Sequence, residues 1–491
     1  MSCLIFTTLF LLSIANSANV IFCSKELEVV EMAREGMLQA MGWAQSFKTV
    51  DGPGFDVGAF GDCVKLYGEA RPRLARLVSG ANTIKWSYED GVTWLSAALA
   101  SHTSCLDGLN QSGLAFQAQR ADNLSSVIRE GLAIYGAKSR RVRQRRKTKA
   151  KAVPRRPSSN QVGRPLASWN AATSDADFVV AQDGSGNHRT INEAVAALAR
   201  LGHNRPERVV IYVKSGTYNE KVEIGSDPKN LMFVGDGMDQ TIVTGNHNVQ
   251  DGSTTMNSAT FGVSGDGFWA RDMTFENTAG PHKHQAVAMR VSSDLSVFYR
   301  CSFKGYQDTL LVHSLRQFYR DCQIYGTVDF IFGDAAAVFQ NCDIFVRKPM
   351  PHQSNMITAQ GRDDPSENTG ISIVNCRVLP SSDFHDVKGK FKSYLGRPWK
   401  KYSRTVFLKT YLDGLVNEKG WKEWSGDFAI STLYYAEYMN TGIGASTSNR
   451  VKWPGFHVLN DPSEAGQFTV KNFIGRDSWI LATGVPFWAE L

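Results

Sequence analysis

Two patterns of apolar residues divide the chain, one on each side of a basic stretch. Between residues 25 and 137, apolar residues recur at intervals of three and four, as at Val30, Ala33, Met37 and Met41. This is the spacing of one face of a helix, and few strand-like runs interrupt it. The pattern predicts a small all-α helical bundle over residues 25–137.

From about Asp177 the chain changes to short β-rich runs, each ending at Gly, Asn or Asp, such as Val209–Val213, Leu231–Val234 and Thr241–Thr244. One helical stretch, Ile191–Leu201, lies near the start of this region, in a position to cap one end. A doubly wound parallel sheet would need long helices between its strands, and the pattern does not contain them. The region is therefore predicted to be all-β.

A weak repeat indicates how the strands are arranged. Five segments resemble one another, and their equivalent positions are separated by 29, 20, 21 and 34 residues, at Arg271, Arg300, Arg320, Asn341 and Asn375. Intervals of about 20–25 residues with insertions of variable length are typical of solenoid coils. We therefore predict a single-stranded, right-handed parallel β-helix over residues 165–491.

The same repeat brings two aspartates together. Asp308 and Asp329 are 21 residues apart, so a coil of that length places them on adjacent rungs, roughly 4.8 Å apart. Two carboxylates this close do not both ionise readily, so one holds a proton. That suits one carboxylate as a nucleophile and the other as an acid and then a base. On spacing alone, a pair without a catalytic role is an equally good interpretation.

The eight cysteines follow no metal-binding pattern, because CxxC, HExxH and zinc-type spacings are absent. Cys322 and Cys342 are 20 residues apart, so the same coil length predicts that they lie within disulfide reach. His282 and His284 form an HxH pair without a third ligand, which we interpret as solvated side chains. The sequence therefore predicts no metal and no cofactor.

The beginning of the chain suggests export. Met1–Leu12 is apolar and small residues follow it, which predicts a signal peptide over residues 1–17. No other stretch is long and apolar enough to span a bilayer, so we expect a secreted protein without a membrane anchor. Asn110 and Asn123 begin glycosylation sequons, which suit an exported protein.

The net charge of +7 arises in one segment. Between Lys138 and Arg164 there are 12 Lys and Arg residues, without an acidic or aromatic residue. A nucleic-acid-binding face would carry aromatics among its cations, so no nucleic-acid partner is expected. Together with Pro154 and Pro157, the composition predicts an exposed, disordered, protease-sensitive linker over residues 138–164. An electrostatic anchor for polyanions is the alternative.

Several stretches of the β-rich region resemble the motifs of the pectinesterase family. They occur in the family's order and at its spacing, and the resemblance covers about residues 177–490: Gly216–Glu220, Gln285–Ala288, Gln307–Leu310, Tyr325–Gly333 and Leu395–Trp399. The resemblance implies an enzyme of the extracellular cell wall. Its reaction would be hydrolysis of the methyl esters of galacturonate in pectin, which releases methanol and free carboxylate.

The resemblance also implies roles for individual residues. Asp329 matches the family's nucleophile, Asp308 the proton donor and acceptor, and Gln307 a side-chain donor to the oxyanion. Arg397 is expected to lie against Asp329, where a fork-like contact keeps the carboxylate charged. By the same resemblance, the residues expected to bind substrate are Thr255, Gln285, Arg397 and Trp399.

Residues 25–137 are similar to the pectin methylesterase inhibitor domain that precedes many plant pectinesterases. The resemblance implies a Cys63–Cys105 disulfide, a proteinaceous inhibitor as a partner, and a subtilase-type protease that cleaves the linker. The chain departs from the family pattern at Cys23, which lacks its usual partner, and at Met256, where the family often has Phe. We expect the protein to be a monomer.

Some interpretations stay open at this point. Trp421, Trp424, Tyr306 and Tyr325 either line a sugar-binding groove or belong to the core. A β-helical pectate lyase or polygalacturonase would share the fold and the polymer, and an inactive esterase-like protein would act through its bundle alone. A serine hydrolase is disfavoured, because no Gly-x-Ser-x-Gly motif occurs.

Overall fold

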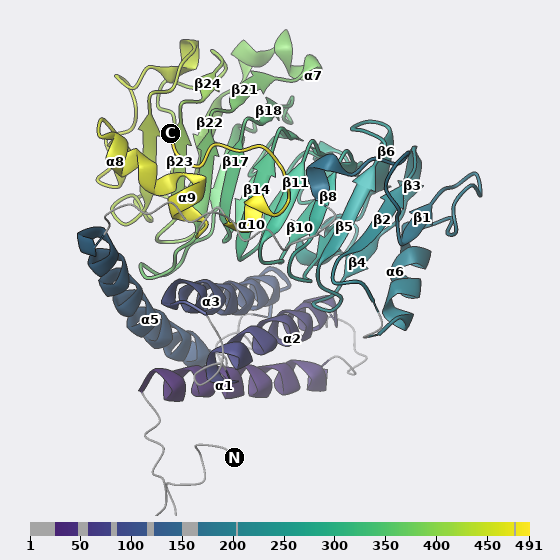
Figure 1. Cartoon of the computed structure of the whole chain (residues 1–491). Coiled ribbons are helices and arrows are strands. Elements are labelled where there is room, and N and C mark those ends of the chain that lie inside the picture. Colours follow the sequence, from purple (N-terminus) through teal and green to yellow (C-terminus); the bar gives the residue numbers. More distant parts are fainter. Residues whose placement is uncertain are drawn as a thin grey trace, which may run out of the picture. The chain divides into compact units, whose positions relative to one another are not determined.

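The computed structural model describes residues 25–47, 57–79, 86–114, 122–149, 165–202, 205–475 and 478–491. The chain forms two compact units, Met1–Ala150 and Lys151–Leu491 (Figure 1). The predicted signal peptide and Cys23 lie outside the described residues.

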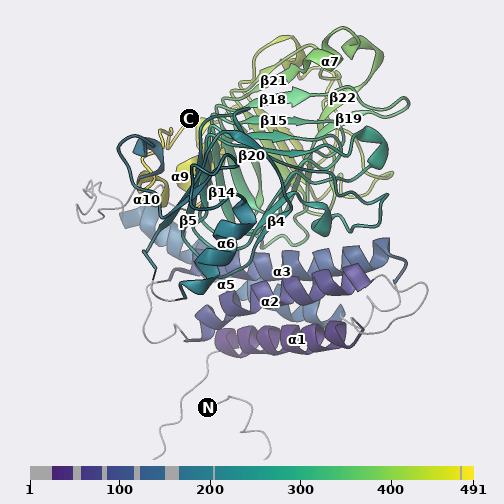
Figure 2. The same ribbon diagram turned by 90° about the vertical axis from the view of Figure 1, so that its right-hand side faces the viewer.

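The first unit is the predicted helical bundle. Its described part contains α1 (Lys25–Phe47), α2 (Val57–Ser79), α3 (Tyr88–Gln111) and α5 (Asp122–Lys149), which pack side by side in Figures 1 and 2. The Cys63–Cys105 disulfide implied by the resemblance is present and joins α2 to α3. Asn110 and Asn123 are exposed, and their glycosylation stays a prediction.

We had predicted that the basic linker begins at residue 138, and this boundary is wrong. Helix α5 continues to Lys149, so residues 138–149 are helical. Lys, Arg and Gln are strong helix formers, and neither Gly nor Pro occurs between Gly136 and Pro154. Residues 150–164 lie outside the described part of the chain, and proteolytic processing in this segment stays a prediction.

The second unit is the predicted parallel β-helix. Most coils contribute one strand to each of three parallel sheets, which we name A, B and C. In pairing order, sheet A contains β1 (Phe178–Val180), β2 (Val209–Val213), β5 (Leu231–Gly235), β8 (Trp269–Arg271), β11 (Ser296–Tyr299), β14 (Arg316–Arg320), β17 (Ala336–Gln340), β20 (Gly370–Val374), β23 (Arg404–Leu408), β25 (Tyr434–Tyr438) and β26 (Phe456–Val458).

Sheets B and C alternate with sheet A along the chain. Sheet B contains β3 (Gly216–Asn219), β6 (Thr241–Gly245), β9 (Thr274–Asn277), β12 (Ser302–Lys304), β15 (Gln323–Gly326), β18 (Asp343–Val346), β21 (Arg377–Pro380) and β24 (Tyr411–Leu412). Sheet C contains β4 (Val222–Ile224), β7 (Phe261–Val263), β10 (Met289–Val291), β13 (Leu310–Val312), β16 (Ile331–Gly333), β19 (Asn355–Gln360) and β22 (Ser393–Gly396).

Short helices occupy the ends and connections of this unit. The α-helices are α6 (Ile191–Arg200), α7 (Ser382–His385), α8 (Pro462–Ala465), α9 (Val470–Phe473) and α10 (Ser478–Leu481). The 3₁₀ turns are η3 (Leu166–Ser168), η4 (Met256–Ser258), η5 (Pro281–Lys283), η6 (Lys388–Lys390), η7 (Ile443–Ala445) and η8 (Gly466–Phe468).

Inside the solenoid, similar side chains from consecutive coils stack on one another. Phe298, Tyr319 and Phe339 follow one another in consecutive coils, with ring centroids 4.9 and 4.4 Å apart. Tyr299 pairs with both Arg271 and Arg320. Arg320 in turn pairs with Gln340, and Gln340 pairs with Val374. Our alignment of the repeat was therefore shifted by one residue in three coils, where we had taken Arg300, Asn341 and Asn375 as equivalent to Arg271 and Arg320.

One end of the solenoid and one outer face are covered by the chain itself. Helix α6 places Ile191, Ala194 and Leu198 in the core next to β1 and β4, so it is the cap that the sequence predicted. The outer face of sheet A is apolar and packs against residues of the C-terminal segment such as Phe468 and Ile480. Figure 1 shows α9 and α10 lying over this sheet.

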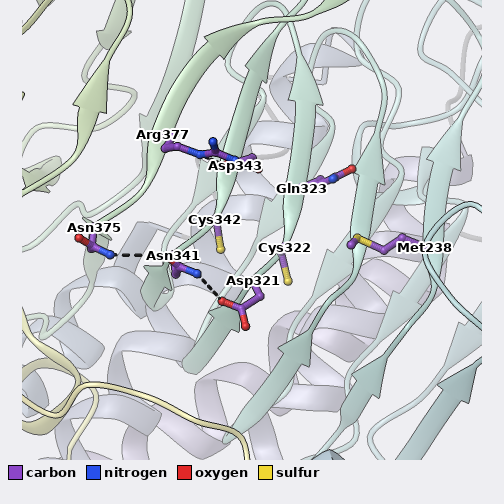
Figure 3. A pocket seen from close by; sticks show the side chains of 9 residues that line it. All are labelled: Met238, Asp321, Cys322, Gln323, Asn341, Cys342, Asp343, Asn375 and Arg377. Carbon is purple, nitrogen blue, oxygen red and sulfur yellow. Dashed lines mark hydrogen bonds and ion pairs between the residues drawn. The ribbon is translucent and has the colours of Figure 1, made fainter. Parts of the chain in front are cut away.

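The predicted Cys322–Cys342 disulfide is not formed, although the two residues lie on neighbouring coils as expected. Both are free and buried, and they contribute to a pocket with about 300 Å³ of accessible volume next to Asp321 (Figure 3). In-register parallel strands direct side chains at equivalent positions in the same direction and not towards each other. Each thiol therefore donates to backbone carbonyls, Cys322 to Arg320 O at 3.4 Å and Cys342 to Tyr319 O at 3.6 Å.

Candidate active site

Two short connections from sheet B to sheet C carry the paired aspartates. Leu310 pairs with Ile331 across β13 and β16, so Asp308 and Asp329, each two residues earlier, lie on adjacent coils. The Asp308 amide donates to Val328 O at 3.0 Å. The juxtaposition predicted from the 21-residue interval is therefore present.

Both aspartates have left-handed backbone conformations, with φ of 63° at Asp308 and 51° at Asp329. Asp tolerates this region better than most residues, and such strain is concentrated at functional sites at a cost of about 1–3 kcal/mol each. The left-handed residue lets each chain turn sharply from sheet B into sheet C, so that the connection stays short and the carboxylates lie at the turn.

Arg397, which follows β22, reaches back to Asp329. Its Nε donates to Oδ1 at 2.8 Å and its Nη2 donates to Oδ2 at 2.5 Å, which is a bidentate contact. The expectation that Arg397 lies against Asp329 is confirmed. The outer face of the guanidinium is covered by the Trp424 ring, whose centroid is 4.3 Å away.

The two carboxyl groups differ in their electrostatic surroundings. Asp308 and Asp329 are 7% and 6% exposed, so neither is fully solvated. Burial and the charge of Asp329 raise the pKa of Asp308 well above its usual range. Burial also raises the pKa of Asp329, but the hydrogen bonds and charge of Arg397 oppose that rise. Asp308 is therefore the more readily protonated of the two carboxyl groups, and Asp329 is the more readily ionised.

The two glutamines precede neighbouring strands of sheet C. Gln285 lies before β10 and Gln307 lies before β13, and the Ala286 amide donates to Gln307 O at 3.2 Å. Thr255 lies on the next coil, at the start of η4. The structure therefore distributes these three residues along the same edge as the aspartates.

An apolar stripe lies beside these polar residues, and the sequence analysis did not predict it. It consists of buried residues on the outer side of sheet C, against which two partly buried residues pack: Ala259, Val287, Leu311, Phe332 and Ala359, with Met256 and Trp399. A Cβ added at Gly361 would come within 2.9 Å of the Trp399 ring, so glycine is needed there. The stripe offers an apolar surface to a methyl ester.

The four aromatic residues left open by the sequence have different surroundings. Trp421 is fully buried and stacks on Tyr435 at 4.2 Å, so it belongs to the core. Trp424 is 38% exposed and covers Arg397, so it belongs to the site. In the sequence, Trp424 is only an aromatic residue in a long loop, and nothing there identifies Arg397 as its partner.

Tyr306 and Tyr325 have ring faces occupied by neighbouring side chains. The Arg347 guanidinium lies 3.8 Å from the Tyr306 ring centroid. Tyr325 stacks on Phe345 with 4.6 Å between centroids, and Lys304 lies over the Tyr325 ring at 5.6 Å. These contacts favour structural ladders over sugar-stacking platforms.

Among the described residues, no group of three or more His, Cys, Asp and Glu side chains is arranged to hold a metal ion. Within the same residues, no helix combines the length and the apolarity needed to cross a bilayer. His282 lies in η5 and His284 directly follows it.

Two family models match the chain: Pectinesterase over residues 177–477, and Plant invertase/pectin methylesterase inhibitor over residues 28–134. The chain is 58% identical to Probable pectinesterase/pectinesterase inhibitor 36 of Arabidopsis thaliana, over 98% of this chain and 97% of that protein. It is 54% identical to Pectinesterase 2 of Citrus sinensis, over 82% of this chain and 76% of that protein.

Solved structures agree with these relatives. Pectin methylesterase from carrot is 53% identical with a TM-score of 0.64, and the match covers 66% of this chain and 100% of that one. A pectin methylesterase in complex with hexasaccharide VII is 27% identical with a TM-score of 0.51, over 62% and 98% of the two chains. The chain therefore belongs to the pectinesterase family, and its reaction is the hydrolysis of methyl esters in pectin.

Proposed function

We propose that Asp329 is the nucleophile of this reaction and that Asp308 is the proton donor and acceptor. A carboxylate oxygen of Asp329 attacks the ester carbonyl carbon at C6 of a galacturonate residue and forms a tetrahedral oxyanion. The oxyanion collapses, the bond to the methoxy oxygen breaks, and the proton of Asp308 passes to that oxygen. Methanol leaves, and an acyl-enzyme on Asp329 remains.

The second half reverses the role of Asp308. Now ionised, it removes a proton from a water molecule that attacks the acyl carbon. The bond to Asp329 breaks, and the galacturonate leaves as a free carboxylic acid that ionises. Asp308 is left protonated and Asp329 ionised, which is the starting arrangement.

The glutamines suit the remaining requirement, which is stabilisation of the oxyanion. We assign this role to the side-chain amide of Gln307, and substrate binding to Thr255, Gln285, Arg397 and Trp399. An amide donates a hydrogen bond without titrating, and one such donor contributes on the order of 3 kcal/mol to lowering the barrier. The apolar stripe that includes Trp399 adds a surface for the ester and the sugar ring.

The single observation that carries this assignment is the contrast between the two aspartates. Asp329 accepts two hydrogen bonds from Arg397, whereas Asp308 is buried beside it with a raised pKa. One group is thereby held as an anion and its neighbour as an acid.

The test is to replace Asp329 by Ala and by Asn and to measure methanol release from methylated pectin, with solution viscosity recorded in parallel. We expect folded proteins without turnover. Retention of more than a few per cent of the wild-type kcat would show that the nucleophile is misassigned. In the wild type, methanol should appear without chain cleavage, which is the result expected of an esterase. A lyase or polygalacturonase would instead cleave the chain and lower the viscosity.

Gln307→Ala provides a second test, because a transition-state donor and a binding residue affect kinetics differently. Loss of the donor should lower kcat by roughly 10²–10³ with little change in KM. A change confined to KM would remove Gln307 from oxyanion stabilisation.

The biological setting belongs to the same proposal. We infer that the protein is secreted to the cell wall through the signal peptide at residues 1–17. We also infer that a subtilase-type protease separates the two units and that proteinaceous pectinesterase inhibitors bind the enzyme. N-terminal sequencing of the secreted protein tests the first two inferences together.

A further inference from the structure

Three consecutive coils have connections from sheet C to sheet A that lie next to one another. They are residues 334–335 between β16 and β17, residues 361–369 between β19 and β20, and residues 397–403 between β22 and β23. The second, which we name the middle connection, bonds to the coils on both sides. The Gly361 amide donates to Gly333 O at 2.8 Å, and the Tyr402 amide donates to Arg362 O at 3.0 Å. The middle connection therefore supports the segment that carries Trp399.

Two carboxyl groups are buried where the first connection meets the middle one. Asp334 is 5% exposed and Glu367 is 2% exposed, and we name them the carboxyl pair. Asp334 Oδ1 accepts hydrogen bonds from Gln360 Nε2 at 3.0 Å and from Thr369 Oγ1 at 2.6 Å. Glu367 Oε2 accepts from two consecutive backbone amides, at 2.9 and 2.8 Å. One oxygen of each group is thus already used as an acceptor.

The other oxygen of Glu367 needs a proton. Oε1 is buried and receives no hydrogen bond from a donor in the described part of the chain. Two ionised carboxylates only accept, so they cannot bond to each other, whereas one proton makes either group a donor. Burial and the charge of Asp334 raise the pKa of Glu367 well above its usual range. Burial also raises the pKa of Asp334, but hydrogen bonds from Thr369 and Glu367 oppose that rise. Glu367 is therefore the member of the pair that holds the proton.

The charged groups around the carboxyl pair favour the singly protonated form. Arg362 is buried, and its guanidinium donates to three backbone carbonyl groups. Arg404 interacts electrostatically with both members of the pair. Asp363 lies close to the pair and Asp364 lies close to Arg362. Two cations thus face two other carboxyl groups, so a doubly ionised pair would add two further negative charges to a buried site.

Arg362 joins the carboxyl pair to the segment that carries Trp399. Its Nε donates to Glu367 O at 3.0 Å, and its Nη1 donates to Tyr402 O at 3.2 Å. The Trp399 ring packs directly on the middle connection, because a Cβ added at Gly361 would lie 2.9 Å from it. A displacement of the middle connection would therefore move both the ring and the segment that follows it.

We propose that Glu367 is a positioning residue for substrate binding: the single proton that it shares with Asp334 fixes the middle connection and, through it, Trp399. This inference rests on the proposed function, because that function assigns substrate binding to Trp399. Both members of the pair are buried, so they act on the substrate only through the residues that they hold. An amide in place of either carboxyl group would supply the same donor permanently.

The first measurement tests the positioning role by the kinetics of methanol release. Glu367→Ala should raise KM roughly threefold to tenfold, which corresponds to a weakened aromatic contact, with little change in kcat. Glu367→Gln should restore the wild-type KM, because its amide accepts from the backbone and donates to Asp334. The control is Glu220→Ala. Glu220 also accepts two backbone amides, at 2.8 and 2.9 Å, at the start of α6, and its loss should leave KM unchanged.

The second measurement tests the shared proton by unfolding the β-helix in denaturant across pH. An unfolded glutamate releases its proton near pH 4.3, whereas folded Glu367 keeps it, so wild-type stability falls as pH rises up to the folded pKa. Glu367→Gln has no proton to release. The ratio of the unfolding constants of the wild type and Glu367→Gln should therefore rise by up to about tenfold per pH unit above about pH 5. The corresponding ratio for Glu220→Gln should not rise.

Asp334→Asn places the donor on the other member of the pair and should match Glu367→Gln in both measurements. A ratio of unfolding constants that stays level with pH in both amide variants would overturn the shared proton. An unchanged KM in Glu367→Ala, or a raised KM that neither amide variant avoids, would overturn the positioning role. Failure of the proposed function is a different result, since it appears as activity that survives the loss of Asp329.

Discussion

The contact between Arg397 and Asp329 gives the sharpest quantitative test of the site. Arg397→Met removes the charge and both hydrogen bonds, at 2.8 and 2.5 Å, and keeps an apolar stem of similar length. Arg397→Lys keeps the charge and loses the bidentate geometry. Asp329 remains 6% exposed, so in the Met variant its carboxylate is left buried without a partner.

Breaking a fully buried ion pair costs about 3–5 kcal/mol. The Arg397 side chain is 23% exposed, so water screens part of the interaction, and we expect Arg397→Met to lower the free energy of unfolding by about 2–3 kcal/mol. If the same interaction is lost from the ionised nucleophile, kcat/KM falls by roughly 30-fold to 150-fold. Arg397→Lys should lie between this variant and the wild type.

The pH dependence has a defined sign. Arg397 opposes the rise that burial imposes on the pKa of Asp329, so removing it raises that pKa further. The nucleophile must be ionised, and activity is lost as pH falls through its pKa. The acid limb of kcat/KM against pH therefore moves to higher pH in Arg397→Met.

The control is Arg377→Met. Arg377 makes a fork of similar geometry with Asp343, at 2.7 and 2.6 Å, but its side chain is 61% exposed. We expect a stability change of less than about 1 kcal/mol and an unchanged pH profile. The measurements are methanol release across pH and unfolding in denaturant. An acid limb that stays in place in Arg397→Met would refute the idea that Arg397 keeps Asp329 ionised.

The basic limb should belong to Asp308, because a general acid with a raised pKa loses its proton, and its activity, as pH rises through that pKa; Asp308→Asn should lower kcat by roughly 10²–10⁴, and a basic limb that persists in its residual activity would contradict the role. Gly333→Ala should destabilise the β-helix by about 3 kcal/mol or more in denaturant unfolding, because φ is 125° and the new Cβ would lie 2.1 Å from Val312 O; unchanged stability would show that this turn can relax. Cys63→Ser removes the disulfide that closes a loop with a sequence separation of 42 residues, so the helical unit of the full chain should lose about 4 kcal/mol of stability in thermal unfolding. The reduced wild type is the control and should show the same loss. Trp424→Ala uncovers Arg397 and should lower kcat and shift the acid limb in the direction of Arg397→Met, while Trp424→Phe retains most of the effect of the ring; a change in KM alone would assign the ring to sugar binding.

Local patterns in the sequence were sufficient for the two architectures. Spacings of three and four identified the bundle, and β-rich runs without intervening helices identified the solenoid, because both depend on residues close together in the chain. The coil length also placed Asp308 beside Asp329, since a regular repeat converts a sequence interval into a distance. The roles of the glutamines and of Arg397 came from the resemblance to a family, and their positions in the structure fit it.

Other features depended on tertiary structure. The length of α5 was misjudged because a run of basic residues was taken as disordered, although such residues favour helix when Gly and Pro are absent. The Cys322–Cys342 pair showed that adjacency between coils is not sufficient for a disulfide, because in-register strands direct both side chains the same way. The repeat was shifted by one residue in part because the sequence motif alone does not give the strand register.

The contacts that tune the site join distant segments. Arg397 lies 68 residues from Asp329 in the chain, and Trp424 lies further on, in a loop with no local signal of its partner. Periodicity reports which face of an element is buried, but not which other coil packs there. The sequence by itself therefore determined the elements, the coil length and the pair of carboxylates. Only the folded solenoid decided how the surroundings of the two carboxyl groups differ, because that difference depends on burial and on an arginine brought from two coils away.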